Sequence, residues 1–228
     1  MQQQLAFTES GSGVATQLKP TSVIHVVDDD ESFRKAVSGL LQAAGFFVQA
    51  YASASEFLLA RLRDTSGCIL LDVRMPNLNG LGLQETLSRH DILLPVIFLT
   101  GYGDIPMSVR AIQAGAVDFL TKPVKRDTLL AAIRTALAKD AERRAAREKS
   151  RRLRTLFEAL TAREREVFDR VVVGKLNKQI AAELGTAERT VKAHRAHIME
   201  KMHVESLAEL VHAADQLESR PASDMHSQ

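Results

Sequence analysis

From Val23 to about Leu137, short apolar runs rich in Val and Ile alternate with stretches that have helical spacing. This alternation is typical of parallel strands joined by crossover helices. The strands that the pattern predicts are Val23–Val27, Phe47–Tyr51, Ile69–Asp72, Val96–Leu99 and Val117–Leu120. The first part of the chain is therefore expected to be an α/β doubly wound, five-stranded parallel sheet.

Apolar residues between the strands fall on helical stripes. Phe33, Val37, Leu40 and Leu41 predict one helix, and Val109, Ala111 and Ile112 predict another. Asp104 and Pro106 resemble a helix start, with a capping carboxylate followed by a proline in the first turn. Both helices are expected to turn their apolar stripes toward the sheet.

After Arg126 no Gly or Pro interrupts the chain until Gly174. Leu129, Leu130, Ile133 and Leu137 are expected to dock on the sheet. The following span is rich in Ala and charge pairs and almost lacks large apolar residues, which favours a solvated helical spacer over a dimer seam. Beyond Leu160 the pattern is purely helical, with breaks at Gly174, Gly185 and around His203, and predicts a bundle of four short helices.

These patterns predict five segments. An α/β domain covers residues 21–138, a helical linker covers 139–157 and an all-helical domain covers 158–217, with disordered tails at 1–20 and 218–228. Thirty Lys and Arg against 28 Asp and Glu exclude wholesale binding of polyanions. The linker region is nevertheless locally basic, so charge distribution matters more than the total.

Cys68 is the only cysteine, so no internal disulfide can form, and a small core residue is a better interpretation than a nucleophile. No stretch approaches the ~20 apolar residues of a membrane span. The opening residues MQQQLAFTESGSG lack the basic flank and apolar core of a signal peptide. We therefore expect a cytoplasmic protein without membrane partners.

Candidate chemistry lies at the ends of the predicted strands. Ligands of doubly wound sheets bind beyond the carboxyl ends of the strands. The polar residues at those positions are Asp28, Asp29, Asp72, Thr100 and Lys122. Carboxylates packed closely repel each other, and Mg²⁺ is the hard cation that holds them ionised. With an ammonium group beside the metal, such a site suits phosphoryl transfer to a carboxylate.

Each of these residues also has an ordinary interpretation. Adjacent aspartates after a strand commonly form turns or cap helices, and Asp30 and Glu31 are best interpreted as the first turn of the next helix. A Thr-Gly pair is commonly a turn, and a lysine before proline is usually a surface residue. The agreement of four strand ends favours the joint functional interpretation.

The segments VVDDDE, LLDVRMPNLNG, FLTG and FLTKPV resemble the receiver domain of response regulators, across roughly Thr21 to Leu137. The resemblance implies sheet order 2-1-3-4-5, phosphorylation of Asp72, and Mg²⁺ bound by Asp29, Asp72 and the backbone carbonyl of Arg74, with Asp28 helping through water. It further implies that Thr100 and Lys122 contact the phosphoryl oxygens. It also implies a cis Lys122–Pro123 bond and an aromatic switch at Phe119. Arg74 and Tyr102 occupy variable positions that tune the lifetime of the acyl phosphate.

The C-terminal segment has its own helical signals. Thr161 and Glu164 form a capping box, Asn177 starts a second helix, and Thr186 is expected to cap a third. On the third helix Val191, Ile198 and Met202 face the core. The opposite stripe carries Arg189, Lys192, Ala193 and Ala196, whose basic and small side chains suit the major groove of DNA. Periodicity alone favours an ordinary amphipathic helix with a solvated face over a helix that reads DNA.

The chain resembles the LuxR-type helix-turn-helix over about Ala159 to Ala213. The resemblance rests on three successive motifs, LT-x-RE-x-EV, G-x-x-NK-x-IA-x-x-L and TVK-x-H. The resemblance implies base reading by Lys192, Ala193 and Ala196 and dimerisation near Leu207–Val211. The resemblance also implies phosphate contacts around Thr190 and His194. From the residue types, Thr190, Asn177 and Lys178 could position the DNA backbone, and Arg189, like Lys192, could reach base edges or phosphates. His194 and His197 lie three residues apart, but packing and phosphate contact are better interpretations than a metal pair.

Joined, the two halves resemble the NarL/FixJ class of response regulators, and TGYGDIPM with the basic linker favours the FixJ/StyR-like branch. The resemblance implies a transcriptional regulator that is not a turnover enzyme. A sensor histidine kinase would phosphorylate Asp72, and the resulting homodimer would bind an inverted repeat in double-stranded DNA, with RNA polymerase as a further partner.

Two other classes of function stay open from the sequence. A haloacid-dehalogenase-like phosphatase also uses a strand-end Asp nucleophile with Mg²⁺, Thr and Lys, but needs a second Asp where Arg74 stands. The Asp28–Asp30 pair has the right spacing but lacks the Thr that should follow it. Alternatively, the receiver could drive a helical domain that binds protein or RNA.

Overall fold

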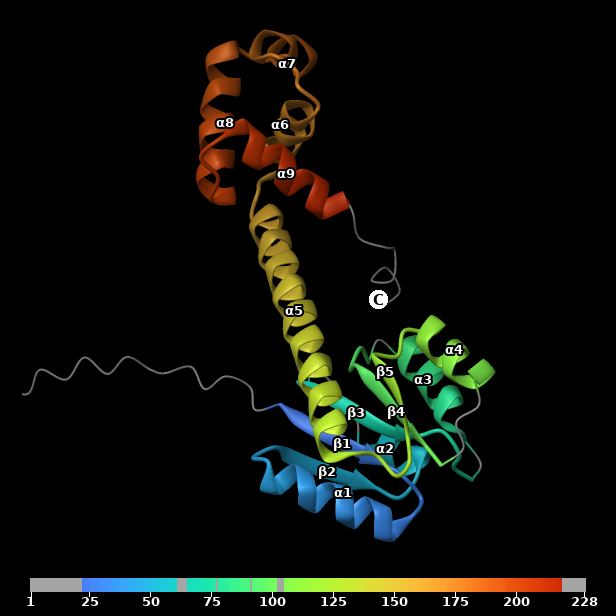
Figure 1. The fold of residues 1–228 in the computed structure, drawn as a ribbon. Coiled ribbons are helices and arrows are strands. Elements are labelled where there is room, and N and C mark those ends of the chain that lie inside the picture. Colours follow the sequence, from blue (N-terminus) through green and yellow to red (C-terminus); the bar gives the residue numbers. More distant parts are fainter. Residues whose placement is uncertain (1–21, 61–64, 77, 91, 102–104, 219–228) are drawn as a thin grey trace, which may run out of the picture. The chain divides into compact units, whose positions relative to one another are not determined.

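A computed structural model describes residues 22–60, 65–76, 78–90, 92–101 and 105–218 of the 228-residue chain (Figure 1). Contacts divide the chain into two compact units, residues 1–141 and residues 142–228. We call them the N-terminal and C-terminal units. The tails expected at 1–20 and after Glu218 lie outside the described residues, as do Tyr102 and Asp104.

The N-terminal unit is built on one parallel sheet. Its strands run in the order β2-β1-β3-β4-β5, all parallel, which confirms the predicted fold class. The strands are β1 (Val23–Val27), β2 (Phe47–Tyr51), β3 (Gly67–Asp72), β4 (Val96–Thr100) and β5 (Asp118–Thr121). Each lies within two residues of its prediction, since runs of Val, Ile and Leu identify buried strands well.

Helices cover both faces of this sheet (Figure 1). One apolar cluster packs α2 (Ala54–Leu59), α3 (Gly80–Arg89) and α4 (Ile105–Gln113) against one face. A second cluster packs α1 (Glu31–Ala43) and the first turns of α5 (Arg126–Glu158) against the other. Because β3 and β4 are central, every one of their residues is buried. The result is a three-layer α/β/α unit.

Helix starts in this unit follow the expected capping chemistry. The Asp30 carboxylate accepts hydrogen bonds from the Ser32 and Phe33 amides, at 2.9 and 3.1 Å, and so caps α1. Val37 and Leu41 are buried, and Phe33 and Leu40 pack beside them, as the stripe predicts. Asp30 is thereby used structurally, although it directly follows the candidate site residues Asp28 and Asp29.

The α4 stripe is a correction to the sequence prediction. Ala111 is fully buried against the sheet, whereas Val109 and Ile112 are each 47% exposed. The small Ala side chain allows α4 to approach the sheet closely, which leaves the larger neighbours at the edge of the contact. The apolar residues of α4 therefore form an outer surface as well as a core contact.

Helix α5 is 33 residues long and enters both units. Leu129, Leu130 and Ile133 dock on the sheet as predicted, and Leu137 packs beside them. The solvated spacer expected over residues 139–157 differs from the structure at both ends. Asp140 is buried in the N-terminal unit, and Leu153, Leu156 and Phe157 pack into the core of the C-terminal unit.

Four helices follow in the C-terminal unit, α6 (Ala162–Val172), α7 (Asn177–Glu183), α8 (Glu188–Met202) and α9 (Leu207–Glu218). The Thr161–Glu164 capping box is present. His203 ends α8 with left-handed backbone, φ 52°. The prediction that Thr186 caps α8 is wrong, since the N-cap residue is Ala187 and makes no side-chain cap bond.

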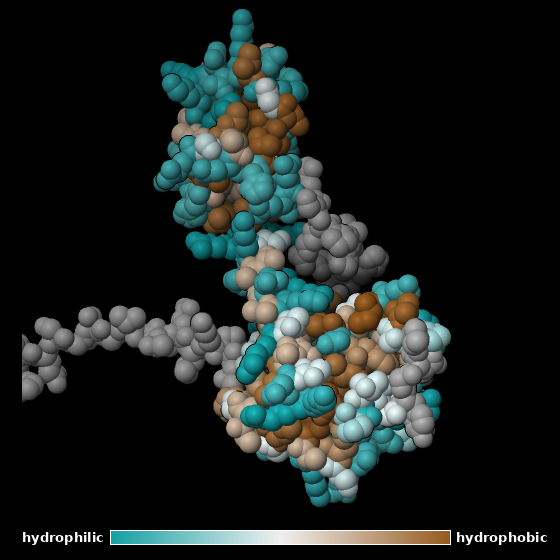
Figure 2. All heavy atoms as spheres, in the orientation of Figure 1, coloured by the Kyte–Doolittle hydropathy of each residue, from teal (hydrophilic) through white to brown (hydrophobic). Residues whose placement is uncertain are grey.

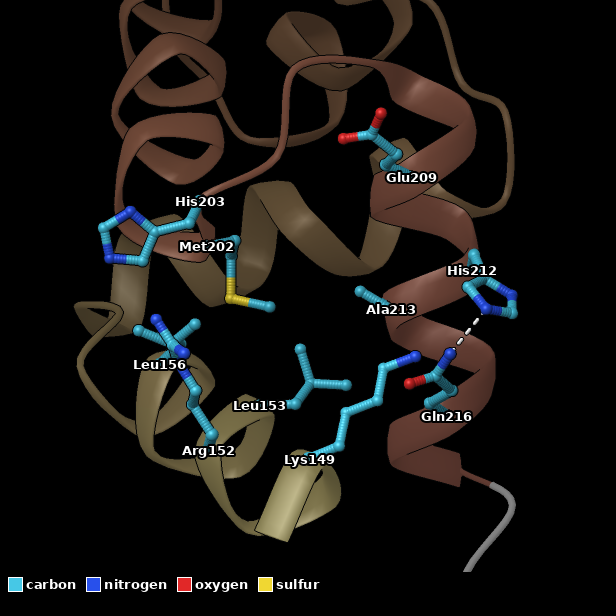
Figure 3. Close-up of a pocket in the computed structure, with 10 residues that line it drawn as sticks. All are labelled: Lys149, Arg152, Leu153, Leu156, Met202, His203, Glu209, His212, Ala213 and Gln216. Carbon is cyan, nitrogen blue, oxygen red and sulfur yellow. Dashed lines mark hydrogen bonds between the residues drawn. The ribbon is translucent and has the colours of Figure 1, made fainter. Parts of the chain in front are cut away.

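The core of this unit is closed by the end of α5. Phe157 and Phe168 meet edge to face, with ring centroids 5.1 Å apart. Leu153 and Leu156 lie beside Met202 and Ala213, around an open pocket of about 290 Å³ whose rim carries Lys149 (Figure 3). Side chains of α5 thus complete a core that α6 to α9 do not close alone.

Candidate functional sites

The strand-end residues converge at the carboxyl edge of the sheet. Asp28 and Asp29 follow β1, Asp72 closes β3, and Thr100 closes β4. Carboxylate oxygens of Asp28, Asp29 and Asp72 lie within 4.8 Å of one another. Parallel strands end on the same edge, so residues separated by more than 40 positions in sequence meet here.

Lys122 joins two of these carboxylates. Its Nζ lies 2.5 Å from Asp28 Oδ2 and 3.2 Å from Asp72 Oδ2. The ammonium also sits over the Phe33 ring, 4.0 Å from the centroid. The Lys122–Pro123 bond is cis, as the resemblance implied, and the Lys122 amide donates to the Thr100 carbonyl at 2.7 Å. The hydrogen bond from the Lys122 amide to Thr100 therefore holds the lysine at the end of β5, where its side chain contacts the carboxylates.

Backbone amides contact the same two carboxylates from the other side. The Asp30 amide donates to Asp28 Oδ1 at 3.0 Å, and the Arg74 amide donates to Asp72 Oδ1 at 3.3 Å. Asp28 is 1% exposed and Asp72 is 7% exposed, whereas Asp29 is exposed. Burial raises the pKa of Asp28, and the Lys122 hydrogen bond only partly opposes it.

Gly80 allows α3 to begin directly against this site. A Cβ atom at Gly80 would lie 2.5 Å from the Asp72 carbonyl oxygen, and 3.0 Å from the Phe98 ring. The Gly80 amide donates to the Val73 carbonyl at 3.1 Å. The role of Gly80 is to permit a close approach that any side chain would block.

Thr100 and Phe119 lie on one face of neighbouring strands. In the β4–β5 register Phe98 pairs with Phe119, and their ring centroids are 6.2 Å apart. Thr100 follows Phe98 by two residues and therefore points to the same face. Thr100 is fully buried, and Phe119 is half-buried against the core. The aromatic ring thus lies in the layer that also contains the hydroxyl.

The donor set fits a hard divalent cation. All candidate ligands are carboxylate oxygens, which Mg²⁺ prefers, and one of them, Asp29, is open to solvent. Among the residues that the structure describes, this is the only group of three acidic, His or Cys side chains close enough to share an ion. His194 and His197 are not part of such a group.

The candidate interface with DNA lies on α8. Arg189, Lys192, Ala193 and Ala196 are all exposed, and Val191 and Ile198 are fully buried on the opposite side. Figure 2 shows hydrophilic side chains over this part of the unit. An exposed stripe of basic and small residues on a well-packed helix is the arrangement expected for insertion into a groove.

Flanking residues of this interface are less exposed. Thr190, His194 and Asn177 are half-buried, and Lys178 is exposed. The Arg195 guanidinium donates to the Asn177 side-chain oxygen at 3.0 Å, which links α8 to the start of α7. Asn177 thus has a structural role between the two helices that the sequence did not reveal.

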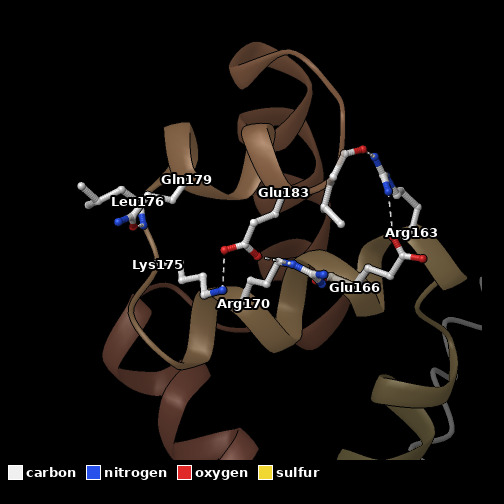
Figure 4. A network of polar contacts seen from close by, with 8 residues as sticks. Arg163, Glu166, Arg170, Lys175, Leu176, Gln179 and Glu183 are labelled. Atoms are coloured by element: carbon white, nitrogen blue, oxygen red, sulfur yellow. Dashed lines mark hydrogen bonds and ion pairs between the residues drawn. The ribbon is translucent and has the colours of Figure 1, made fainter.

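Another side of the C-terminal unit carries a network of ion pairs in which three cations share two carboxylates. Glu183 accepts from Arg170 at 3.0 Å and from Lys175 at 2.5 Å, and Arg163 pairs with Glu166 at 2.7 Å (Figure 4). These bonds connect α6 with α7. Because each cation here faces a carboxylate, this side offers less free positive charge than the α8 stripe.

Both halves of the chain match known protein families. Residues 24–134 match the family described as response regulator receiver domain, and residues 158–214 match the bacterial regulatory proteins of the luxR family. The chain is a two-component response regulator. Its receiver domain and luxR-type domain agree with the NarL/FixJ class, and a turnover enzyme such as a phosphatase is excluded by the same matches and by the relatives.

Relatives of the regulator share most of its length. Nodulation protein W of Bradyrhizobium diazoefficiens is 44% identical over 211 residues, covering 92% of this chain and 93% of that protein. The response regulator protein TodT of Pseudomonas putida is 45% identical over 196 residues, covering 86% of each. The transcriptional regulatory protein FixJ of Azorhizobium caulinodans is 39% identical over 201 residues, covering 88% of this chain and 95% of that protein.

Solved structures lead to the same conclusion. The response regulator StyR is 48% identical, with a TM-score of 0.77, and covers 86% of this chain and 99% of its own. Full-length FixJ from B. japonicum is 35% identical, with a TM-score of 0.54, and covers 89% of this chain and 100% of its own. The regulator is thus similar to full-length transcriptional regulators and not to isolated receivers alone. In the described part of the regulator, no helix is both long and apolar enough to cross a membrane.

Proposed function

We propose that a sensor histidine kinase transfers a phosphoryl group to Asp72 and that the phosphorylated regulator, located in the cytoplasm, dimerises and binds an inverted repeat in double-stranded DNA. The observation that carries the proposal is the shared lysine, since Lys122 lies within 3.2 Å of both Asp28 and Asp72. An Asp72 oxygen attacks phosphorus as the phosphohistidine P–N bond breaks, and the Lys122 ammonium stabilises charge on the phosphoryl oxygens.

Asp28, Asp29 and Asp72, with the backbone carbonyl of Arg74, would hold Mg²⁺. The bound metal would neutralise part of the charge on the phosphoryl oxygens. The close approach of three acidic side chains, of which only Asp28 and Asp72 contact Lys122, supports this assignment, because a second cation would relieve their mutual repulsion. Asp29, the exposed member, leaves one side of the cluster open to water and to the phosphodonor.

A change of surface would follow phosphorylation. The Thr100 hydroxyl would turn toward the phosphoryl group, and Phe119 would move into the space that it leaves. Val109 and Ile112, each 47% exposed on α4, offer apolar area for a dimer contact near β5. Dimerisation through α9 near Leu207, which is 42% exposed, would then hold two α8 helices on adjacent half-sites.

The exposed stripe of α8 would read base edges. Lys192, Ala193 and Ala196 would face the bases, with Arg189 beside them, and Lys178, Thr190, His194 and Asn177 would contact the backbone. The exposure of Lys192, Ala193, Ala196 and Arg189 supports their part in this division, since Thr190, His194 and Asn177 are half-buried and reach less far from the surface. RNA polymerase would meet the regulator when both are bound to promoter DNA.

Labelling with acetyl phosphate tests the phosphorylation site. Asp72→Asn should abolish the incorporated label, because the amide is not a nucleophile toward phosphorus, and omission of Mg²⁺ should reduce the label in the unsubstituted protein. Asp30→Asn is the matched control. It changes a neighbouring carboxylate, and asparagine caps α1 as well as aspartate does, so labelling should persist. Retained label on the Asp72→Asn protein would place the acceptor elsewhere.

A further inference from the structure

Asp140 is a buried carboxylate far from the candidate phosphorylation site. It is 4% exposed, and its Oδ2 accepts hydrogen bonds from the Ser66 hydroxyl and the Gly67 amide, both at 3.0 Å. Gly67 begins β3, whereas Asp72 ends it, so Asp140 lies at the opposite edge of the sheet. Burying a charge is costly unless hydrogen bonds satisfy it, so this position calls for a physical reason.

The partners of Asp140 lie where β1 and β3 begin. The Val23 amide donates to the Ser66 carbonyl at 2.8 Å, and the hydroxyls of Ser22 and Ser66 are 3.0 Å apart. A Cβ atom at Gly67 would lie 1.8 Å from the Val23 carbonyl oxygen, so the two strand starts are in close contact. Asp140 therefore ties α5 to the starts of both β1 and β3.

Along α5, Asp140 is the last buried residue. The helix buries Leu129, Leu130, Ala132, Ile133 and Ala136 against the sheet, and Asp140 follows Ala136 by one turn on the same side. Between them only Leu137 adds a partly buried apolar contact. The final turn of α5 within the N-terminal unit is thus held by two directional hydrogen bonds rather than by a large apolar side chain.

We propose that Asp140 is a positioning residue that sets the rotational phase at which α5 leaves the receiver, and that this phase is required for phosphorylation to change DNA binding. Apolar contacts tolerate small rotations of a helix, whereas two hydrogen bonds to one carboxylate oxygen specify its direction. Helix α5 runs from Arg126 to Glu158, so Asp140 lies between the turns that dock on the sheet and the turns that pack in the C-terminal unit. The coupling part of the inference rests on the proposed function.

The single cysteine provides a local probe of this contact. Cys68 follows Gly67 and is fully buried in the cluster that α5 covers, together with Leu129, Ile133 and Ala136. A thiol reagent reaches it only when this part of the unit opens. The rate of Cys68 modification under native conditions therefore reports the docking of α5, independently of phosphorylation.

The test compares Asp140→Ala with Glu142→Ala, which removes an exposed carboxylate from the next turn of α5. Asp140→Ala leaves the Gly67 amide and the Ser66 hydroxyl without their acceptor, and should raise the Cys68 modification rate at least about tenfold. Labelling of Asp72 by acetyl phosphate should stay unchanged. The increase in DNA affinity caused by beryllofluoride should fall to less than about a third of the unsubstituted value, while Glu142→Ala behaves like the unsubstituted protein.

Two further variants test the same hydrogen bonds in milder form. Asp140→Asn retains an acceptor oxygen and should preserve most of the coupling, and Ser66→Ala removes one donor only and covers the case in which Asp140→Ala fails to fold. Unchanged Cys68 modification in both Asp140→Ala and Ser66→Ala, or full beryllofluoride response despite rapid modification, would overturn the positioning role. Failure of the unsubstituted protein to take label would instead refute the proposed function and leave the Cys68 result standing.

Discussion

The two units of the regulator use buried and half-buried charge in opposite ways. At the carboxyl edge of the sheet, the carboxylates of Asp28, Asp29 and Asp72 lie close together, and one lysine contacts two of them, Asp28 and Asp72. In the C-terminal unit, Glu164 pairs with Lys201 at 2.7 Å, and Glu183 has two cationic partners. The first arrangement has more carboxylates than cations, whereas the second has at least one cation for each carboxylate.

The pKa values follow the same contrast. Burial raises the pKa of Asp28 despite its lysine. Burial also acts on Glu164, but hydrogen bonds from Lys201 and from the Thr161 amide outweigh it and lower the pKa of Glu164 to about 2. A cluster with fewer cations than carboxylates is suited to bind an additional cation, whereas a carboxylate that is fully paired and hydrogen-bonded stabilises the fold.

The largest predicted effect is the response to acid, which should destabilise the N-terminal unit at a higher pH than the C-terminal unit. Burial lowers the pKa of His25 from 6.5 to about 4. Because His25 is harder to protonate in the folded state than in the unfolded state, its neutral form contributes to the free energy of unfolding above pH 6.5. About 3 kcal/mol of that free energy should be lost as the pH falls toward 4. Hydrogen exchange of peptides from each unit, followed from pH 7 to 3, measures this loss.

The contrast with the C-terminal unit makes this prediction specific. The lowered pKa of Glu164 contributes stability above pH 4.5 that is lost only as the pH falls toward 2. Amides of the C-terminal unit should therefore stay protected after those of the sheet begin to exchange. A His25→Leu variant should remove most of the loss between pH 6.5 and 4, and equal acid sensitivity in that variant would show that other groups control it.

An intermediate effect is expected on the exposed stripe of α8. Lys192→Ala should weaken binding to the operator by about 2 kcal/mol, roughly 30-fold, and relax the preference for one sequence, if the ammonium contacts a base edge. Arg147→Ala removes an exposed charge from α5 and serves as the control. Quantitative mobility shifts on specific and scrambled duplexes measure the affinity and the sequence preference of both variants.

Identical binding by both variants would refute base reading by Lys192. Absence of sequence preference in the unsubstituted protein would favour a different output partner.

The smallest effect is expected in the ion-pair network of Figure 4. Glu183→Gln weakens two ion pairs, with Arg170 and Lys175, whose side chains are 29% and 39% exposed. Because exposed ion pairs contribute little, the unfolding midpoint of the C-terminal unit should not measurably change. Glu164→Gln, which alters a buried partner of Lys201, should lower the same midpoint clearly. A large loss in Glu183→Gln would mean that the network is structural.

Sequence patterns predicted the sheet and the convergence of its polar residues because both depend on local periodicity and on the rule that parallel strands end together. Asp28, Asp29, Asp72 and Lys122 meet as expected. Their chemical roles remain proposals, as do the DNA contacts.

Features that depend on distant partners were not predicted. The use of Asp140 requires Ser66, 74 residues earlier, and no local pattern connects them. His25 gave a usable signal, because a polar residue inside the run VIHVV is unusual in a fully buried strand. Thr186 illustrates the opposite error, since a residue with good capping chemistry stands one position before the actual N-cap.

The continuity of α5 has a practical consequence for dissecting the regulator. A receiver fragment that ended at residue 138 would lack the Asp140 carboxylate, and a DNA-binding fragment that began at residue 158 would lack Leu153, Leu156 and Phe157. Each fragment would then be less stable than the same unit in the whole chain, because side chains that complete its contacts would be missing. Division within residues 142–148 leaves both sets of contacts in place.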